Sequence, residues 1–445
     1  MSSVLIKNAI LINEGEKKEA DLLIKGEYIE KIGLGLSAES ADRVIDAAGS
    51  YLMPGIIDDQ VHFREPGLTH KGNIATESRA AVGGGVTSFM EQPNTNPQTV
   101  TIERLEEKMA IAARTSFANY SFKFGGTNDN LEELKRLDPK ACSGVKLFLG
   151  SSTGNMLVDD EKVIESIFSN TNMVISAHCE DEETIRKNLE YYKEKYGDDI
   201  PIGLHPVIRS HEACYLSSSR AIALAKKTGA RLHVFHLSTA VETGLFDNSI
   251  PLKDKKITAE VCTHHLWFND QDYADKGTLI KWNPAVKGEK DRLALWAALL
   301  DDRIDVLATD HAPHTLEEKQ NPYTKAPSGG PLVQHTLNAM IQKHKEGVIS
   351  MEKLVEKMCH SPAILFDVEK RGYLREGYFA DLVLVDPNKS YTVSKDNIAY
   401  KCGWSPFEGV TFDSVVTHTF VNGHLAYENG KFSEEQHGKR LTFER

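Results

Sequence analysis

Short apolar runs alternate with longer amphipathic segments through the middle of the chain, from residue 51 to about residue 310. Several runs are continuously apolar, which is typical of strands buried on both faces of a parallel sheet. Eight runs with helical segments between them match an α/β fold of the TIM (β/α)8 barrel type; the open doubly wound sheet is the alternative. The predicted strands are Ile56–Ile57, Val86–Met90, Tyr120–Phe124, Val145–Leu149, Met173–Ala177, Leu232–Leu237, Ile257–Val261 and Ile304–Ala308.

The two ends of the chain have a different sequence pattern, which predicts short strands separated by turns rich in Gly, Asn and Asp. Each end is too short for an independent core, so we expect the ends to meet in one small accessory β-domain beside the barrel. The predicted division is 1–55 and 367–445 for the two parts of this β-domain and 56–366 for the barrel. Its predicted strands are Val4–Ile6, Ala9–Ile12, Asp21–Ile24, Tyr28–Ile32, Leu382–Val385, Val415–Val421 and His424–Tyr427.

The amino-acid composition is that of a soluble enzyme and argues against a nucleic-acid-binding or membrane protein. Of the 445 residues, 40% are hydrophobic and 26% are charged, which is ordinary for a soluble globular enzyme. The net charge of −12 argues against a nucleic-acid partner, which calls for clustered Lys and Arg. Six cysteines without a CxxC pair, no evident signal peptide and no apolar run near ~20 residues predict a reduced, cytoplasmic protein that is not inserted in a membrane. We therefore expect a small-molecule substrate.

Side chains with catalytic or metal-binding potential fall at the ends of the predicted barrel strands. In a parallel barrel these ends open onto one face, where active sites are built. Imidazole and carboxylate groups together suit zinc, which also accepts an open water position. The side chains at the strand ends are Asp58, His62, Asn94, His178, His236, His264, His265 and Asp310, and Lys146 lies inside the fourth strand.

Each of these residues has a simpler alternative. A single histidine at a strand end is commonly a hydrogen-bonded structural residue, and Asp310 could cap the segment that follows it. Lys146 is more unusual, because burying an unpaired ammonium within an apolar strand is costly. A carbamate formed with carbon dioxide and bridging two metals would remove that charge. A buried ion pair with Asp310 or Glu180 is the alternative.

Several long segments, in order along nearly the whole chain, resemble the cyclic amidohydrolases and, within them, the dihydroorotases. The first looks like the opening metal motif and substrate loop of that family, and ATDHAPHTLEEK looks like its last metal motif. The last two resemble its accessory β-domain. The segments are GIIDDQVHFREPGLTHKGNIATESRAAVGGGVTSFMEQPNTNP, THHLWF, KWNPAVKGEKDR, ATDHAPHTLEEK, PSGGPLVQHTL, GYLREGYFADLVLVDP and WSPFEGVTFDSVVTHTFVNG.

The resemblance implies a reaction and a set of roles. The reaction is the reversible cyclisation of N-carbamoyl-L-aspartate to L-dihydroorotate in pyrimidine biosynthesis, by a zinc-bound hydroxide with Asp310 as general acid and base. One or two zinc ions are implied, with carboxylated Lys146 as the bridge. The implied metal ligands are His62, Lys146, His178, His236 and Asp310; the implied substrate-binding residues are Arg64, Asn94, Asn283 and His314, with backbone from Pro327 to Gly330 closing the site.

Two positions depart from the family pattern. Gln60 stands where the first histidine of a His-x-His pair is expected, and an amide oxygen suits zinc less well than imidazole does. The metal site nearer the first strand is therefore weak, rebuilt with Asp58 or Asp59, or empty. Lys287 stands where many relatives carry Arg. The Ser/Gly-rich segment 149–156 is either a mobile loop over the site or a solvated turn.

Arg64 distinguishes between substrates. A guanidinium can bind a carboxylate through two hydrogen bonds, and dihydroorotate carries a carboxylate where hydantoins and dihydropyrimidines do not. Asn94 could share that carboxylate, and a surface ion pair with Glu65 is the alternative for Arg64. Two other functions stay open: dihydropyrimidinase or allantoinase, and a non-catalytic homologue acting as a structural partner, for example of aspartate transcarbamoylase. A homodimer is also open.

Overall fold

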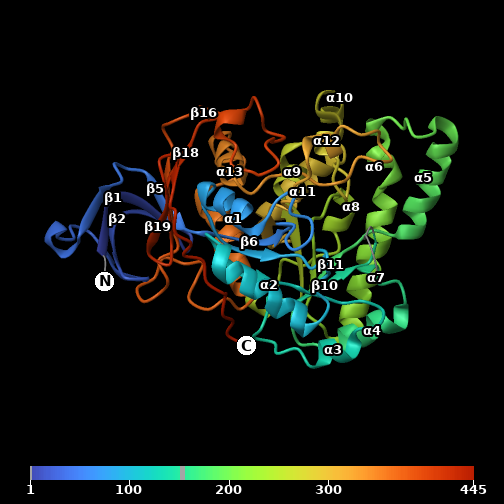
Figure 1. The fold of residues 1–445 in the computed structure, drawn as a ribbon, viewed down its shortest axis with the longest axis horizontal. Helices are drawn as coiled ribbons and strands as arrows, with labels where there is room; N and C mark the ends of the chain where they lie inside the picture. Colours follow the sequence, from blue (N-terminus) through green and yellow to red (C-terminus); the bar gives the residue numbers. More distant parts are fainter. Residues whose placement is uncertain (1–2, 151–155) are drawn as a thin grey trace.

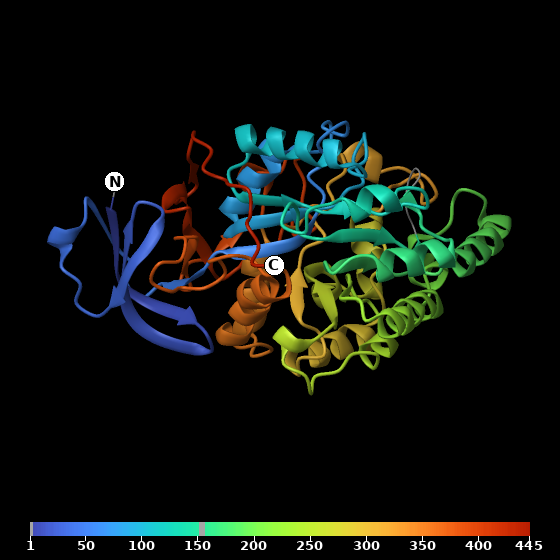
Figure 2. The ribbon, with the colours of Figure 1, turned by 90° about the horizontal axis from the view of Figure 1, so that it is seen from below.

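The computed structural model describes residues 3–150 and 156–445 and contains a parallel barrel beside a second β-sheet (Figures 1 and 2). All eight predicted strands are present and pair in parallel with their neighbours, so the predicted barrel is confirmed. Five of the loop residues of segment 149–156 lie outside the described residues. The barrel strands are β6 (Ile56–Val61), β7 (Val86–Glu91), β8 (Asn119–Phe122) continued by β9 (Phe124–Gly125), β10 (Val145–Phe148), β11 (Ile175–His178), β12 (Leu232–Val234), β13 (Ile257–Cys262) and β14 (Val306–Ala308).

The barrel strands form two hydrogen-bonded arcs, β6–β8 and β9–β14. The third strand changes partner at Lys123: its N–H donates to the Glu91 carbonyl (2.9 Å), whereas the next N–H, of Phe124, donates to the Gly144 carbonyl (2.9 Å). On the other side, the His62 N–H donates to the His311 carbonyl (2.7 Å). The first and last strands therefore meet, and all carboxyl ends open at the same mouth.

Helices cover the outside of the barrel (Figure 2), and their ends follow capping chemistry. For example, Asn73 Oδ1 accepts from the Thr76 N–H at the start of α1, and Gly229, at φ 75°, ends α7. No described helix has the length and apolarity needed to cross a membrane. The helices are α1 (Ile74–Gly83), α2 (Ile102–Thr115), α3 (Leu131–Lys135), α4 (Glu161–Ser169), α5 (Glu182–Tyr196), α6 (His205–Ile208), α7 (His211–Thr228), α8 (Ala240–Thr243), α9 (Thr263–Trp267), α10 (Tyr273–Lys276), α11 (Glu289–Leu300), α12 (Leu316–Lys319), α13 (Thr336–Lys345), α14 (Met351–Val355) and α15 (Ser361–Leu365).

The two chain ends meet in one nine-stranded sheet, as predicted, because β15 pairs with β5 on one side and β18 on the other. The two short strands predicted within residues 4–12 are one strand, β1, whose register shifts between Ile6 and Ala9, with Asn8 at φ 56°. The sheet has its own buried apolar cluster, which includes Leu22, Leu52 and Leu382. Its strands are β1 (Ser3–Asn13), β2 (Glu16–Lys25), β3 (Tyr28–Gly33), β4 (Arg43–Asp46), β5 (Tyr51–Pro54), β15 (Leu382–Asp386), β18 (Val415–Val421), β19 (His424–Glu428) and β20 (Lys431–Phe432).

Candidate functional site

A pocket of about 100 Å³ opens at the carboxyl ends of the barrel strands. It brings together residues from eight separate stretches of the sequence, as expected for the mouth of a parallel barrel. His314, which was predicted to bind substrate, does not line the pocket but lies next to Arg64. The predicted residues that line the pocket are His62, Arg64, Asn94, Lys146, His178, His236, Asn283 and Asp310, and Gln60 lies among them.

Two imidazole rings face each other at the ends of β11 and β12. Nδ1 of His178 lies 3.0 Å from Nε2 of His236. Nε2 of His178 lies 2.9 Å from the Glu180 carboxylate, an acceptor, so this nitrogen carries the proton of the neutral ring and Nδ1 presents its lone pair. Burial lowers the pKa of both histidines, which keeps them neutral, as metal ligands must be. Together with Lys146 in the same pocket, they form a donor set that fits one metal ion.

Glu180 and Arg209 lie behind this pair of histidines. Their contact with each other was not predicted from the sequence. Glu180 is fully buried, and its carboxylate contacts both His178 and the Arg209 guanidinium. Burial opposes the charge of Glu180, but Arg209 and His178 outweigh burial and lower its pKa to about 2. An ionised carboxylate behind an imidazole fixes which ring nitrogen faces the site. Glu180 therefore orients His178.

Lys146 projects from β10 and is buried. Its Nζ lies 4.0 Å from the centre of the Phe235 ring and 4.8 Å from that of Phe148. Among the described residues, no carboxylate lies within 4.0 Å of the Lys146 Nζ. Asp310 and Glu180 instead contact other side chains, so Lys146 does not form the ion pair that was the alternative prediction. Burial lowers the pKa of Lys146 to about 7. The lowered pKa increases the share of neutral amine at neutral pH, and the neutral amine is the form that can react with carbon dioxide.

His62 and Asp310 meet on the opposite side of the pocket. Nδ1 of His62 lies 2.9 Å from Asn94 Oδ1, so it donates and leaves the lone pair on Nε2. That lone pair faces Asp310 Oδ1 at 3.2 Å, an arrangement that needs a positive charge between the two atoms. Gln60 Nε2 donates to the same Asp310 oxygen (3.3 Å), and Gln60 Oε1 lies 3.7 Å from Cys262 Sγ. Gln60 thus presents an N–H, and not its oxygen, to Asp310.

The two acidic neighbours of Gln60 point away from the pocket. Asp58 accepts from Thr309 Oγ1 (2.6 Å), and burial raises its pKa well above the usual range. The Asp59 carboxylate points toward His233. Gln60 lines the pocket and neither acid does, in the part of the chain that the structure describes. A metal site rebuilt with Asp58 or Asp59 therefore does not match their positions.

Three further candidates from the sequence lie outside the pocket wall. His264 stacks on the Trp282 ring at 4.4 Å, and His265 Nε2 lies 3.1 Å from the Pro284 carbonyl. Lys287 Nζ lies within hydrogen-bonding distance of the Ala285 carbonyl (3.2 Å). These three side chains do not line the pocket.

Arg64 enters the pocket from the segment after β6 and is 7% exposed. Its Nε donates to the Pro313 carbonyl (3.0 Å), and Nη2 lies 3.0 Å from His314 Nε2. Burial lowers the pKa of Arg64 to about 10, so it stays charged at neutral pH. Glu65, the predicted alternative partner, instead accepts from the Ile74 N–H (2.9 Å). No carboxylate of the described residues lies within 4.0 Å of the Arg64 guanidinium.

Three residues of this mouth have a strained backbone. Arg64 (φ 72°), His236 (φ 38°) and Asp310 (φ 48°) adopt positive φ angles that non-glycine residues rarely adopt. Such strain costs of order 1–3 kcal/mol per residue and persists where the surrounding structure enforces it. Gly329, at φ 124°, is also required, because a Cβ there would lie 2.6 Å from the Ala312 carbonyl oxygen.

A buried lysine binds the backbone of the segment 327–330. Lys319 Nζ donates to the carbonyls of Pro327 (2.9 Å), Gly329 (2.8 Å) and Lys281 (3.2 Å), which uses all three of its hydrogens. The segment 327–330, predicted to close the site, is thereby joined to the strand-end segment that carries Asn283. Ser328 Oγ donates directly to Asn283 Oδ1 (2.9 Å).

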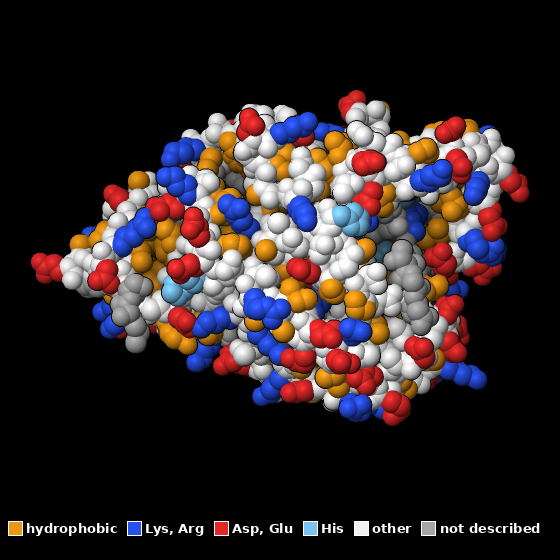
Figure 3. Space-filling model, in the orientation of Figure 1, with side chains coloured by type: hydrophobic (Ala, Val, Ile, Leu, Met, Phe, Trp, Pro, Cys, Tyr) orange, Lys and Arg blue, Asp and Glu red, His pale blue; other side chains and the backbone are white. Residues whose placement is uncertain are grey.

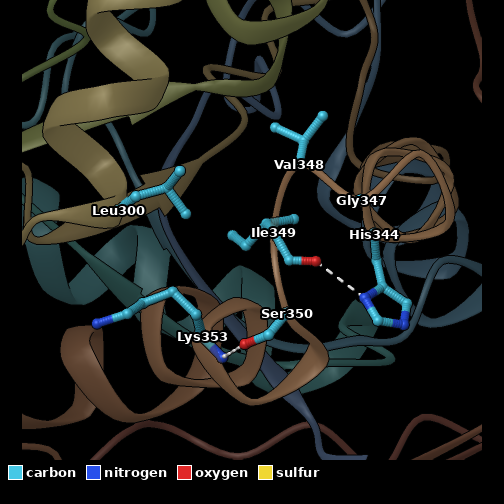
Figure 4. Close-up of a pocket in the computed structure, with 7 residues that line it drawn as sticks. All are labelled: Leu300, His344, Gly347, Val348, Ile349, Ser350 and Lys353. Atoms are coloured by element: carbon cyan, nitrogen blue, oxygen red, sulfur yellow. Dashed lines mark hydrogen bonds between the residues drawn. The ribbon is translucent and has the colours of Figure 1, made fainter.

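A second hollow offers less chemistry than the pocket at the barrel mouth. It has a volume of about 460 Å³ and lies between Leu300 and the segment after α13 (Figure 4). Its His344 Nδ1 donates to the Ile349 carbonyl, and its Ser350 Oγ caps the helix that begins at Met351. On the face shown in Figure 3, acidic and basic side chains are interspersed, with no broad basic patch. The pocket at the barrel mouth is therefore the candidate active site.

Known proteins are similar to this chain over nearly its whole length. The profile of the amidohydrolase family matches residues 51–426. A dihydroorotase from Methanosarcina mazei is 33% identical over 421 residues, which cover 92% of this chain and 91% of the relative. A dihydroorotase from Clostridium acetobutylicum is 31% identical over 431 residues, which cover 96% of this chain and all (100%) of the relative.

Solved structures with a similar fold carry a different name. An L-hydantoinase (dihydropyrimidinase) from Arthrobacter aurescens has a TM-score of 0.94 at 28% identity, with 99% of this chain and 100% of that chain covered. A dihydropyrimidinase from Brevibacillus agri has a TM-score of 0.88 at 26% identity, with 100% of both chains covered. The choice between these substrates therefore depends on the chemistry of the pocket.

Proposed function

Because the chain belongs to the amidohydrolase family, we propose that it is a dihydroorotase, which interconverts N-carbamoyl-L-aspartate and L-dihydroorotate in pyrimidine synthesis. The observation that carries this choice is the buried Arg64 guanidinium in the pocket. A buried cation without a carboxylate partner is costly unless a ligand supplies one. The carboxylate of dihydroorotate supplies that partner.

The surroundings of Arg64 support a bidentate contact. Its Nε is already bound to the Pro313 carbonyl, which fixes the plane of the guanidinium. Asn94 and Asn283 also line the pocket and offer amide groups to the same substrate. Hydantoins and dihydropyrimidines without a carboxylate would leave Arg64 unpaired, so they are the less favoured substrates. The dihydropyrimidinase-like structural neighbours make this alternative worth a direct test.

Zinc fits the donors of the pocket, and Lys146, His178 and His236 would hold it on one side. On the other side His62 and Asp310 would hold a second ion, with Lys146 as a carbamate bridging both. When bound, zinc lowers the pKa of a bound water from about 15.7 towards roughly 7 and polarises a carbonyl oxygen. The lone pairs on His178 and His62, each fixed by the partner of the opposite ring nitrogen, support this assignment.

Asp310 is the proton carrier in this proposal. It lies at the end of β14 in a strained conformation, with Oδ1 directed at His62 and Gln60. In the direction of hydrolysis, it takes a proton from the attacking water and returns it to the leaving ring nitrogen. In the direction of synthesis, it removes a proton from the carbamoyl nitrogen as the ring closes.

Other parts of the proposal follow from the same assignment. The enzyme would act in the cytoplasm. A homodimer and an association with aspartate transcarbamoylase remain predictions. A structural partner without catalysis is less favoured, because Lys146, His178, His236 and Asp310 are all retained in one pocket.

The decisive experiment compares two substrates on two proteins. The wild type and Arg64→Ala are assayed with L-dihydroorotate and with 5,6-dihydrouracil, a similar ring that lacks the carboxylate. We expect Arg64→Ala to raise KM for dihydroorotate roughly 10- to 100-fold, the equivalent of a charged hydrogen bond of about 1.5–3 kcal/mol. Its metal content and its activity on dihydrouracil should stay close to the wild type. Unchanged kinetics with dihydroorotate would exclude the carboxylate role of Arg64.

A further inference from the structure

Beneath the pocket, three side chains from three barrel strands converge on one point. Asp59 comes from β6, His233 from β12 and Glu260 from β13, and all three are fully buried. His233 Nε2 lies 3.3 Å from Asp59 Oδ2 and 3.7 Å from Glu260 Oε2. Their candidate ligand atoms all lie within 4.8 Å of one another. We call Asp59, His233 and Glu260 the inner cluster.

The hydrogen bonds of His233 determine which nitrogen faces the carboxylates. Nδ1 of His233 lies 2.8 Å from Thr258 Oγ1. The Thr258 hydroxyl donates its single hydrogen to the Leu232 carbonyl (3.3 Å), so it accepts from Nδ1–H. In the neutral ring, Nε2 therefore presents a bare lone pair to two carboxylates. Three electron-rich groups in one buried place require a positive charge between them.

The atoms that face this point have no hydrogen-bond partner. Both oxygens of Asp59, Oε2 of Glu260 and Nε2 of His233 are buried and unpaired among the described residues. Buried polar atoms are rarely left in this state, and an unseen ion or water is one of the standard explanations. The second Asp59 oxygen would allow this carboxylate to bind an ion through both atoms.

The spacing of the inner cluster matches a metal better than it matches a proton. Separations of 3.3 and 3.7 Å are long for charge-assisted hydrogen bonds, which are about 2.7–2.9 Å. Ligands at about 2.0–2.2 Å from a tetrahedral zinc lie roughly 3.3–3.6 Å apart. We propose that the inner cluster binds a divalent transition-metal ion of the zinc type, held by His233 Nε2 and the carboxylates of Asp59 and Glu260.

This ion would have a structural role. Its site is closed, whereas catalytic zinc keeps a position open to water or substrate. The other oxygen of Glu260, Oε1, accepts from the backbone N–H of His236 (3.2 Å) and from Cys262 Sγ (3.2 Å). The ion would therefore tie β6, β12 and β13 together and brace the strained backbone at His236, directly below the pocket.

Lys123 is the competing source of positive charge. Its buried Nζ stacks 4.0 Å above the Phe366 ring and lies beyond 4.0 Å from either carboxylate of the inner cluster. Burial lowers its pKa to about 8, although Asp59 and Glu260 oppose that shift. If Lys123 balances the carboxylates, its removal should destabilise the barrel. If a metal balances the two carboxylates, the Lys123 ammonium repels that ion, and its removal should not weaken metal binding.

Anomalous X-ray scattering at the zinc absorption edge tests the proposal on full-length protein expressed with zinc. We expect a peak between Asp59, His233 and Glu260, separate from any peak in the pocket. Asp59→Asn should abolish the inner peak alone, and Glu260→Gln is the second variant should Asp59→Asn fail to fold. His178→Asn is the matched control, which should lose pocket metal and keep the inner peak.

Each outcome has one meaning. No inner peak in zinc-grown protein, or an inner peak that persists in both Asp59→Asn and Glu260→Gln, overturns the proposal. Lys123→Met should keep the inner zinc and the thermal midpoint of the wild type; loss of both would identify Lys123 as the balancing charge and also overturn it. An inner peak without pocket metal would contradict the proposed zinc in the active site and leave the inner cluster supported.

Discussion

The barrel contains two buried polar layers, one at its mouth and one beneath it, which use the same kinds of residue and share the segments of two strands, β6 and β12. Strand β6 contributes Asp59 to the inner cluster and leads to His62 in the pocket. The β12 segment contributes His233 to the inner cluster and His236 to the pocket. Both layers combine imidazole with carboxylate, and the upper layer lines the pocket, whereas the three residues of the inner cluster are fully buried. Access to substrate, and not the type of residue, therefore distinguishes the two layers.

The two layers also differ in how their lone pairs are fixed. In the pocket, a carboxylate behind His178 and an amide behind His62 set the ring nitrogens. In the inner cluster, one threonine hydroxyl does so for His233. Variants that act on one layer should leave the other in place, and this separation is what the following predictions test.

The largest effect is expected for Lys146→Ala. Removal of the carbamate bridge should abolish metal binding in the pocket and lower kcat by about 10³-fold or more, because several kcal/mol of charge stabilisation are lost. Short carboxylic acids should partly restore activity by replacing the carbamate. Metal analysis and steady-state kinetics measure both effects. Full metal occupancy of the pocket in this variant would show that Lys146 is not a bridge.

The control for this variant lies in the other layer. Lys146→Ala should keep the zinc of the inner cluster, since the inner ligands come from β6, β12 and β13 and not from β10. Simultaneous loss of both ions would mean that the layers are one coupled site. The comparison between the layers would then fail.

A smaller effect is expected for Glu180→Gln. This change keeps the shape of the side chain but removes the charge that orients His178, and loss of such a partner typically costs about 10- to 100-fold in metal affinity. Titration of the metal-depleted protein with zinc measures that affinity. Arg209→Met should have a similar but weaker effect, because the carboxylate itself remains. Zinc affinity equal to the wild type in Glu180→Gln would show that Glu180 does not orient His178.

Most of the fold could be predicted from the sequence because buried parallel strands are continuously apolar. Strand ends were predicted less well where the backbone leaves regular strand geometry. The sixth strand was expected to reach Leu237, but β12 ends at Val234, because His236 adopts φ 38°. In the same way, β1 was predicted as two strands, because the register shift around Asn8 breaks its alternating pattern.

The pocket was easier to predict than the inner cluster for a physical reason. Strand-end residues share a position that the barrel topology brings to one mouth, so each can be placed without knowledge of its contacts. Asp59, His233 and Glu260 meet only across the barrel interior, which depends on strand register and tilt. A signal was nevertheless present, since each is a charged or ionisable residue within an apolar strand, the same feature that singled out Lys146.

The smallest effect is expected for Gln60→His, which tests the half of the pocket nearest β6. Gln60 donates an N–H to Asp310 Oδ1, and so supplies part of the positive charge that a metal would otherwise bring to that oxygen. An imidazole would replace this donor with a ligand that zinc prefers. We expect zinc in the pocket to rise by up to one equivalent, with kcat/KM changing by less than about tenfold, or about 1.4 kcal/mol. Gln60→Met, which offers neither donor nor imidazole, is the matched control. If Gln60→His and Gln60→Met bind equal amounts of zinc, residue 60 does not limit the second metal, and the reason lies in the His62–Asp310 pair itself.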